Sequence, residues 1–255
     1  MGDRDTRRGG ASASDIVAGF YQSDTCKLCR GPLDGDSAHL CKGCGKRSKM
    51  LNAAAEQSHA EALRRERQAA IGKARGSMPE RFHAVRFAAD LSRRVQNTAA
   101  IAQARTAIGN AMVTLQGASG TGKTTLAAAM YNEVIERALM GDAEAYALAI
   151  GAMWTSAPAV ARARREHPLG SGEAPLIVRA RKATLLVVDD VGMEREHDAV
   201  SALLYERHAD VLPTVVTTGF YTADLYKNYG DGIVRRLVEE TQSTVIPCDL
   251  DEVSQ

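Results

Sequence analysis

The sequence predicts an α/β fold built on a parallel sheet, and two observations support this prediction. Apolar runs of strand length alternate with helical segments from residue 111 onward, and a glycine-rich turn joins the first strand to the next helix. Residues 185–188 and 214–218 are continuous apolar or β-branched runs, which are typical of strands buried on both faces. The 255 residues are 45% hydrophobic and 25% charged, as in an ordinary globular protein.

Changes in composition divide the chain into four expected parts. Residues 1–20 are polar and aperiodic, which predicts a disordered tail. Residues 21–50 are rich in cysteine and glycine and are too few for a hydrophobic core. Residues 51–77 form a basic linker whose Ala-, Glu- and Arg-rich run over 52–73 predicts a helix. Residues 78–255 form the α/β domain.

The elements of the α/β domain follow in order. A strand is expected at 111–115 and a helix at 123–138. Residues 145–150 are expected as a second strand, although their alanine content leaves a helix open. The remaining strands are expected at 185–188, 214–218 and 244–247.

Charge is distributed unevenly along the chain. The formal net charge is +1, but residues 46–94 hold twelve Lys or Arg against five Asp or Glu, a net of +7. Residues 183–255 hold five against fourteen, a net of −9. A basic region favours contact with nucleic acid or an acidic partner, but solvated helix faces give the same pattern, and both interpretations stay open.

No apolar stretch approaches the ~20 residues of a membrane-spanning helix. The N-terminus also lacks the apolar region of a secretory signal. We therefore expect a cytoplasmic protein with no membrane partner. In that reducing compartment, cysteines are expected as metal ligands or buried thiols and not as disulfides.

Two C-x-x-C pairs separated by eleven residues lie near the N-terminus: Cys26, Cys29, Cys41 and Cys44. Four thiolates at this spacing predict a tetrahedral structural Zn²⁺ site, whose metal would supply the folding energy of the module. Gly43 and Gly45 are suited to tight turns in such a module. Two disulfides or loose thiols are the alternative. Cys248 is expected to be an incidental thiol.

Residues 117–124, GASGTGKT, match the G-x-x-x-x-G-K-[ST] pattern of a phosphate-binding loop. Glycines let such a loop wrap closely around a triphosphate, so that backbone N–H groups and the following helix N-terminus face the phosphates of ATP or ADP. Lys123 is expected to contact the phosphates, and the Thr124 hydroxyl is expected to bind Mg²⁺. The predicted nucleotide-binding residues are Gly117, Ala118, Ser119, Gly120, Thr121, Gly122, Lys123, Thr124 and Thr125.

A pair of acids ends the apolar run LLVV. Asp189 is the better candidate to bind Mg²⁺ through water, as in a Walker-B motif, and Asp190 would then polarise the attacking water. Two acids at the end of a strand also serve as turn formers or helix caps, which is the structural alternative.

These motifs, together with LLVVDDVG at 185–192, LPTVVTTGF at 212–220, DGIVRRL at 231–237 and SMPERF at 77–82, resemble the AAA+ helicase loaders of the DnaC type and the related IstB transposition ATPases. The resemblance covers about residues 78–247. It implies a P-loop AAA+ core with a five-stranded parallel sheet and no helical lid. It also implies ATP-dependent assembly into a ring or spiral, with Arg236, or the adjacent Arg235, completing hydrolysis in the neighbouring subunit.

Two departures from the family pattern bear on turnover. Gly219 follows the two threonines at a position where family members usually carry a polar residue, so Thr217 or Thr218 would orient the water, or hydrolysis is slow. Asp190 stands where many AAA+ proteins have the longer Glu. Weak basal ATPase activity would follow from either departure.

A basic segment lies where initiator and loader ATPases carry an inserted helix that follows the DNA backbone. The basic residues Arg162, Arg164, Arg165, Arg179, Arg181 and Lys182 stand against Glu166 and Glu173, a net of +4. Arg162, Arg164 and Arg165 are therefore predicted to bind single-stranded DNA. An ordinary basic surface helix is the alternative.

The resemblance implies a loader that grips a hexameric replicative helicase through its N-terminal zinc module and places it on single-stranded DNA. Nucleic-acid binding by the zinc module is a competing role for that part. The alternatives for the whole chain are a transposition helper of the IstB type and a nucleotide-gated adaptor with little turnover.

Overall fold

The structure is a computed structural model, and it describes residues 25–33, 39–88, 90–95, 97–239 and 243–249. The chain divides into two compact units, Met1–Arg64 and Arg65–Gln255. The predicted tail at 1–20 lies outside the described residues, and the predicted domain limits remain predictions. In the part of the chain that is described, no helix combines the length and the apolar character needed to cross a membrane.

The helix predicted at 52–73 is present, and it extends beyond the predicted range at both ends, since α2 runs over Lys42–Ser77. It begins directly after Cys41, and its N–H groups start bonding at Gly45, which donates to the Cys41 carbonyl at 2.8 Å. Gly43 and Gly45 therefore lie in the first turn of a helix, and the tight turns predicted for them are wrong. The start of α2 occupies the positions where the tight turns were expected.

The second unit is built on a sheet of five parallel strands in the order β2-β3-β4-β1-β5. The strands are β1 (Met112–Gln116), β2 (Met153–Ser156), β3 (Leu186–Val191), β4 (Thr214–Thr218) and β5 (Ser243–Pro247). Because all strands are parallel, their carboxyl ends share one edge, where ligands bind in sheets of this kind. The phosphate loop follows β1 and the two acids lie at the end of β3, so both meet at that edge.

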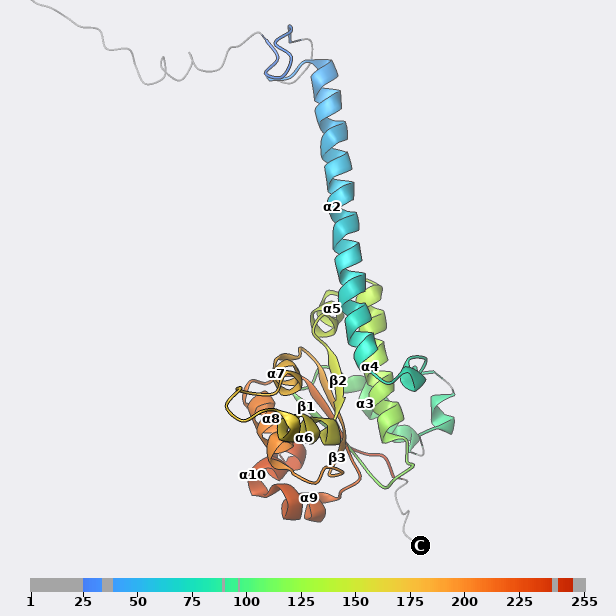
Figure 1. Ribbon diagram of the computed structural model, residues 1–255. Helices are drawn as coiled ribbons and strands as arrows, with labels where there is room; N and C mark the ends of the chain where they lie inside the picture. The colour runs from blue at the N-terminus through green and yellow to red at the C-terminus, as the bar shows by residue number, and fades with distance from the viewer. Residues whose placement is uncertain (1–24, 34–38, 89, 96, 240–242, 250–255) are drawn as a thin grey trace, which may run out of the picture. The chain divides into compact units, whose positions relative to one another are not determined.

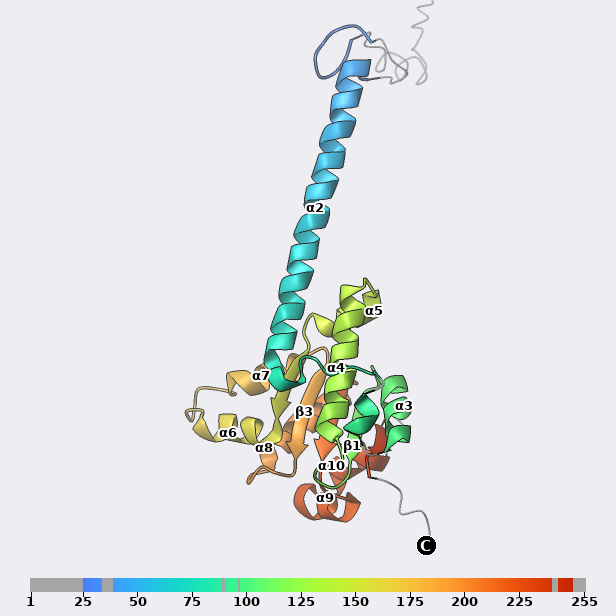
Figure 2. The same ribbon diagram turned by 90° about the vertical axis from the view of Figure 1, so that its right-hand side faces the viewer.

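Helices cover both faces of the sheet (Figures 1 and 2). The chain adds α3 (Thr98–Thr106), α4 (Lys123–Leu139), α5 (Ala143–Ala149), α6 (Ala157–Glu166), α7 (Pro175–Lys182), α8 (Asp198–Ala209), α9 (Thr222–Tyr229) and α10 (Asp231–Val234). Short turns η1 (Glu80–Phe82), η2 (Leu91–Arg93) and η3 (Arg235–Glu239) complete it. Along β3, Val187 joins the core under α3–α5, whereas Leu186 and Val188 join the core under α6–α10. Because side chains on both faces of β3 enter a core, residues 185–188 are all apolar.

The strand expected at 145–150 is wrong, because this segment lies in helix α5. Asp142 caps that helix, and its side chain accepts a hydrogen bond from Ala145 N at 3.0 Å. Alanine is the best helix former, so a capped alanine-rich run favours a helix over a strand. The second strand is β2, which starts at Met153.

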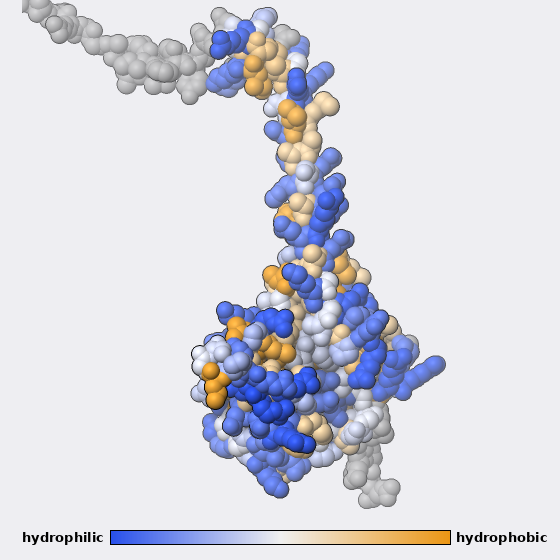
Figure 3. Space-filling model, in the orientation of Figure 1, coloured by the Kyte–Doolittle hydropathy of each residue, from blue (hydrophilic) through white to orange (hydrophobic). Residues whose placement is uncertain are grey.

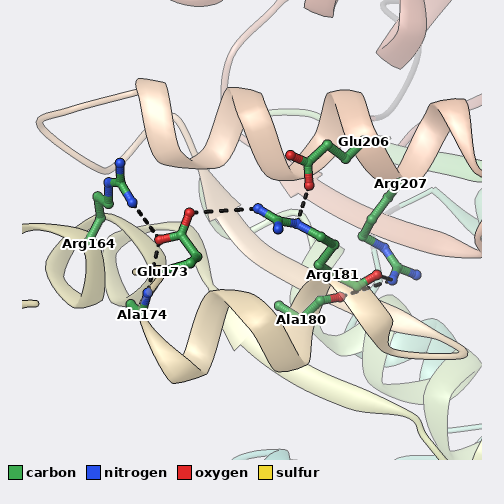
Figure 4. A network of polar contacts seen from close by, with 7 residues as sticks. All are labelled: Arg164, Glu173, Ala174, Ala180, Arg181, Glu206 and Arg207. Atoms are coloured by element: carbon green, nitrogen blue, oxygen red, sulfur yellow. Dashed lines mark hydrogen bonds and ion pairs between the residues drawn. The ribbon is translucent and has the colours of Figure 1, made fainter. Parts of the chain in front are cut away.

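A fully buried arginine, Arg207 of α8, forms hydrogen bonds to the end of α7 and to the start of β4. Figure 4 shows its bond to Ala180. Its guanidinium donates to the carbonyl oxygens of Ala180, Arg181, Ala183 and Pro213 and to Thr214 Oγ1, at 2.7 to 3.1 Å. Burial lowers the pKa of Arg207 to about 10, so the group stays protonated at neutral pH. Nothing in the local sequence signals this role, because every acceptor lies in another element.

Replacing Arg207 with methionine is expected to lower the free energy of unfolding by at least about 3 kcal/mol, because several buried carbonyl oxygens lose their donors. Urea unfolding of the variant measures the change. Arg179→Met, at an exposed position of α7, is the matched control and is expected to stay within about 0.5 kcal/mol of the parent. Equal stability of the two variants would contradict this role for Arg207.

Candidate functional site

The phosphate loop joins β1 to α4 in a conformation that requires glycine. Gly120 and Gly122 have φ values of +85° and +95°, which side chains rarely allow. A Cβ atom on Gly122 would also overlap the backbone carbonyl oxygen of Arg94. The first N–H groups of α4 have no acceptor within the helix, and a helix N-terminus of this kind binds phosphate groups.

Two charged side chains contact the loop itself. Lys123 is buried, and its Nζ donates to the carbonyl oxygens of Gly117 at 2.8 Å and Ala118 at 2.6 Å. The carboxylate of Asp249, just beyond β5, accepts from Ala118 N and from Tyr221 Oη, both at 2.8 Å. Asp249 was not predicted as a site residue, because 131 residues separate it from its partner in the loop.

Asp189 and Thr124 meet at the carboxyl edge of the sheet. Thr124 Oγ1 donates to Asp189 Oδ1 at 2.9 Å, and Thr217 Oγ1 donates to the same oxygen at 2.6 Å. Burial raises the pKa of Asp189, and the adjacent charge of Asp190 adds to this rise. A hydroxyl and a carboxylate in contact are the oxygen ligands that Mg²⁺ prefers, so these residues fit the predicted metal. When bound, Mg²⁺ would neutralise phosphate charge there.

Asp190 is exposed and lies at an irregularity of β3. Its φ is +59°, and the pairing of β3 with β4 shifts register between Val188 and Val191. Bulges of this kind re-aim side chains near functional sites. The backbone N–H group of Asp190 donates to Thr217 Oγ1 at 2.9 Å. The Thr217 hydroxyl therefore bonds to the carboxylate of Asp189 and to the backbone of Asp190. Its neighbour Thr218 is also engaged, since its hydroxyl donates to the Val191 carbonyl at 2.8 Å.

The arginine pair begins η3, directly after α10. The guanidinium of Arg236 stacks on the ring of Tyr205 at 4.2 Å and donates to the Gly232 carbonyl. Arg235 is more exposed, and its Nη1 lies 3.8 Å from a carboxylate oxygen of Asp231. The contacts described for the two arginines are with Tyr205, Gly232 and Asp231, and their predicted role in a neighbouring subunit stays a prediction.

The three arginines predicted to bind DNA lie on α6 but face different surroundings. Arg164 Nη1 donates to Glu173 at 2.7 Å, and Figure 4 shows this pair in a network that continues to Arg181 and Glu206. Arg162 and Arg165 instead line a hollow of about 560 Å³ with the loop that follows β3, which contributes Arg195 but also Glu194 and Glu196. The surface over α6 is strongly hydrophilic (Figure 3).

The four predicted zinc ligands come together in the first unit. The Sγ atoms of Cys26, Cys29, Cys41 and Cys44 all lie within 4.8 Å of one another. Cys29 Sγ and Cys41 Sγ are 3.7 Å apart, which matches the edge of about 3.8 Å expected for a tetrahedron with Zn–S bonds of about 2.3 Å. Backbone N–H groups of Cys29 and then Cys41 lower the pKa of the Cys26 thiol to about 6. Side-chain hydrogen bonds with Cys29 and then Cys41 raise the pKa of the Cys44 thiol, so it is the distances between the Sγ atoms that indicate a metal. The cluster therefore fits a structural Zn²⁺ ion.

A parallel sheet with a phosphate loop after β1 and an acidic pair at the end of β3 is typical of the P-loop class of folds. No family model and no curated protein matches the chain. Among solved structures, the DnaC helicase loader aligns with a TM-score of 0.51 at 18% identity, over 67% of this chain and 100% of that one.

Two further structures give similar values. A candidate primosome component from Streptococcus pyogenes serotype M3 aligns with a TM-score of 0.50 at 20% identity, over 71% of this chain and 96% of that one. DnaI aligns with a TM-score of 0.49 at 21% identity, over 68% and 92%. At 18% identity, the likeness to the DnaC helicase loader shows the fold alone. The chain thus has the AAA+ fold of the DnaC loader, and the predicted fold class is confirmed.

Proposed function

We propose that the protein is a cytoplasmic, ATP-dependent helicase loader that binds a hexameric replicative helicase and promotes its loading onto single-stranded DNA. The observation that carries the proposal is the contact of Thr124 with Asp189 beside the phosphate loop, on a fold shared with a helicase loader. This geometry supports binding of ATP or ADP with Mg²⁺, with Lys123 on the phosphates and Asp190 polarising water.

The zinc module would provide the helicase-binding half. Exposed apolar side chains, Leu28 at 67% and Leu51 at 62%, line a hollow of about 460 Å³ beside Cys29 and Cys44. Exposed hydrophobic side chains of this size favour a protein partner over a nucleic acid, which would require mainly charge. Figure 3 shows apolar and hydrophilic atoms side by side on this unit.

The arginine pair would complete hydrolysis between subunits of a ring or spiral. A guanidinium presented to the γ-phosphate stabilises the charge of the transition state and makes turnover depend on assembly. The exposure of Arg235 supports it as the residue that reaches the neighbour, with Arg236 stacked behind it on Tyr205. Arg235→Ala and Arg236→Ala should therefore be compared separately in an ATP hydrolysis assay.

The proposal is tested by mixing the purified protein with its cognate hexameric helicase, with and without ATP, and measuring complex mass and helicase loading on a DNA circle. We expect a complex that loads only with ATP. Binding to a transposase but not to the helicase would instead favour the transposition helper. Failure of calorimetry to detect ATP or ADP binding by metal-replete protein would reject every nucleotide-dependent role.

A nucleotide-gated adaptor is the second candidate, and one observation favours it. Both threonine hydroxyls before Gly219 are engaged within the protein, Thr217 with Asp189 and Thr218 with the Val191 carbonyl. Neither is then available to orient water unless its bond breaks. A Lys123→Ala variant that still binds and loads the helicase would favour the adaptor.

Replacing both Arg162 and Arg165 with alanine is expected to weaken single-stranded DNA binding about tenfold and to lower the salt slope by about 1.4, the loss of two phosphate contacts. Fluorescence anisotropy over a salt series measures both. Arg164→Ala is the matched control, because Glu173 already neutralises that guanidinium. A slope unchanged in the double variant, or equally reduced in the control, would remove this surface from the proposal.

A further inference from the structure

A buried carboxylate lies in the loop that follows the two acids. The Glu194 side chain is 0% exposed, and its Oε2 accepts a hydrogen bond from Gly192 N at 2.9 Å. Its Oε1 accepts from the Tyr229 hydroxyl and lies 3.2 Å from His197 Nδ1. A carboxylate is removed from water only at a high cost, so these partners must hold it in one position.

The hydrogen bond from Gly192 N to Glu194 fixes residues 189–194, which we call the acid loop. Gly192 follows Asp190 by two residues and has a φ of +104°. A Cβ atom on Gly192 would meet the ring of Phe220 at 2.7 Å, so the turn has little room to move on that side. With Glu194 holding its N–H group on the other side, the turn sets the direction of Asp190.

The hydrogen bond from the Tyr229 hydroxyl to Glu194 fixes the arginine segment. Tyr229 is the last residue of α9, and Gly230, with a φ of +72°, turns the chain into α10, which leads directly to Arg235. Burial, and then the Glu194 charge, raise the pKa of Tyr229, so its hydroxyl remains a donor to the carboxylate. His197 also packs on the Tyr229 ring, with centroids 4.7 Å apart.

We infer that Glu194 is a positioning residue that couples the acid loop of one nucleotide site to the arginine that the same subunit presents to its neighbour. The Tyr229 hydroxyl carries this coupling. The inference rests on the proposed function, because it needs an arginine that acts between subunits. It adds a structural connection by which the loop after the two acids holds the arginine segment of the same subunit in place.

The test uses two full-length variants that complement each other. A Lys123→Ala subunit offers its arginines but has a disabled site, and an Arg235→Ala/Arg236→Ala subunit has an intact site but no arginine. Their mixture is expected to regain ATPase activity that neither has alone. Tyr229→Phe is then added to one partner at a time. In the arginine-bearing subunit it is expected to lower kcat about tenfold, with KM unchanged. In the site-bearing subunit Glu194 keeps its bond to Gly192, and we expect less than about a twofold change.

Tyr131→Phe is the matched control, because this buried tyrosine donates to the Ala74 carbonyl at 2.9 Å, far along the chain from the acid loop. It is expected to affect both mixtures equally. Glu194→Gln provides a second variant, which is expected to lower activity in either subunit. Equal effects of Tyr229→Phe in both subunits, or no effect, would overturn the inference. If the parent mixture fails to regain activity, the arginine acting between subunits is rejected, and the coupling with it.

Discussion

Replacing Lys123 with alanine is expected to lower ATP turnover by at least about 100-fold, the usual loss when one charged donor to a transition state is removed. The Lys123 ammonium is buried and lies on the phosphate loop, where two backbone carbonyl oxygens hold it. A cation in this water-poor position stabilises phosphate charge far more than a surface lysine does. Steady-state hydrolysis of ATP, with calorimetric binding measured in parallel, tests the effect.

Lys182→Ala is the matched control, since this lysine is exposed at the end of α7. Its turnover is expected to stay within about twofold of the parent. Thermal unfolding of Lys123→Ala separates a chemical loss from a folding defect, because the variant leaves only loop carbonyls without their donor. Turnover retained within about threefold in a folded Lys123→Ala protein would be incompatible with the mechanism.

The sheet was predictable where a strand carries one continuous signal. The strand predicted at 214–218 coincides with β4, and the strand predicted at 185–188 lies within the observed strand or one residue before it. Both are apolar or β-branched runs without alanine that are covered by helices on both faces. The alanine-rich segment at 145–150 carries a mixed signal, and there the Asp142 cap, which favours a helix, is a local feature that the apolar pattern hides.

The candidate site was predictable where its residues belong to a sequence motif, as those of the phosphate loop and of the acid pair after LLVV do. The glycine loop, Lys123 and Thr124 form one motif, and that motif predicts its own helix. The partner of Thr217 was not predicted. Its position in the sequence suggested a role in orienting water, whereas its hydroxyl donates to Asp189 at 2.6 Å. That bond joins residues 28 positions apart, and only the register of β3 on β4 brings them together.

Charge patterns were the least informative part of the sequence. The basic segment that ends at residue 182 is partly neutralised by Glu206 of α8, which pairs with Arg181 (Figure 4). Buried charges such as Arg207 and Glu194 have no periodic or motif signal, because their partners are backbone groups and side chains from other elements. The sequence therefore indicates how much charge a segment has but not which charges remain free to bind a ligand.

Removing the metal with a chelator is expected to unfold the cysteine module at residues 25–44 and to abolish helicase binding, while nucleotide binding persists. Among the described residues of the first unit, Cys26 is the only apolar side chain that is fully buried, so this unit has almost no hydrophobic core. Structural zinc contributes about 10–16 kcal/mol in comparable modules, which is far more than such a core supplies. The second unit has its own core on both faces of the sheet, so we expect it to stay folded when the metal is removed.

Metal analysis of the full-length protein is expected to give about one zinc ion per chain. Limited proteolysis with and without chelator locates the unfolding, and calorimetry with ATP reports on the second unit. Cys44→Ser is expected to lose zinc and helicase binding together, whereas Cys248→Ser, which changes a buried thiol of the second unit, is expected to keep its zinc. Zinc-free protein whose N-terminal residues resist protease would contradict the predicted site, because without metal the module has too little buried apolar surface to remain folded.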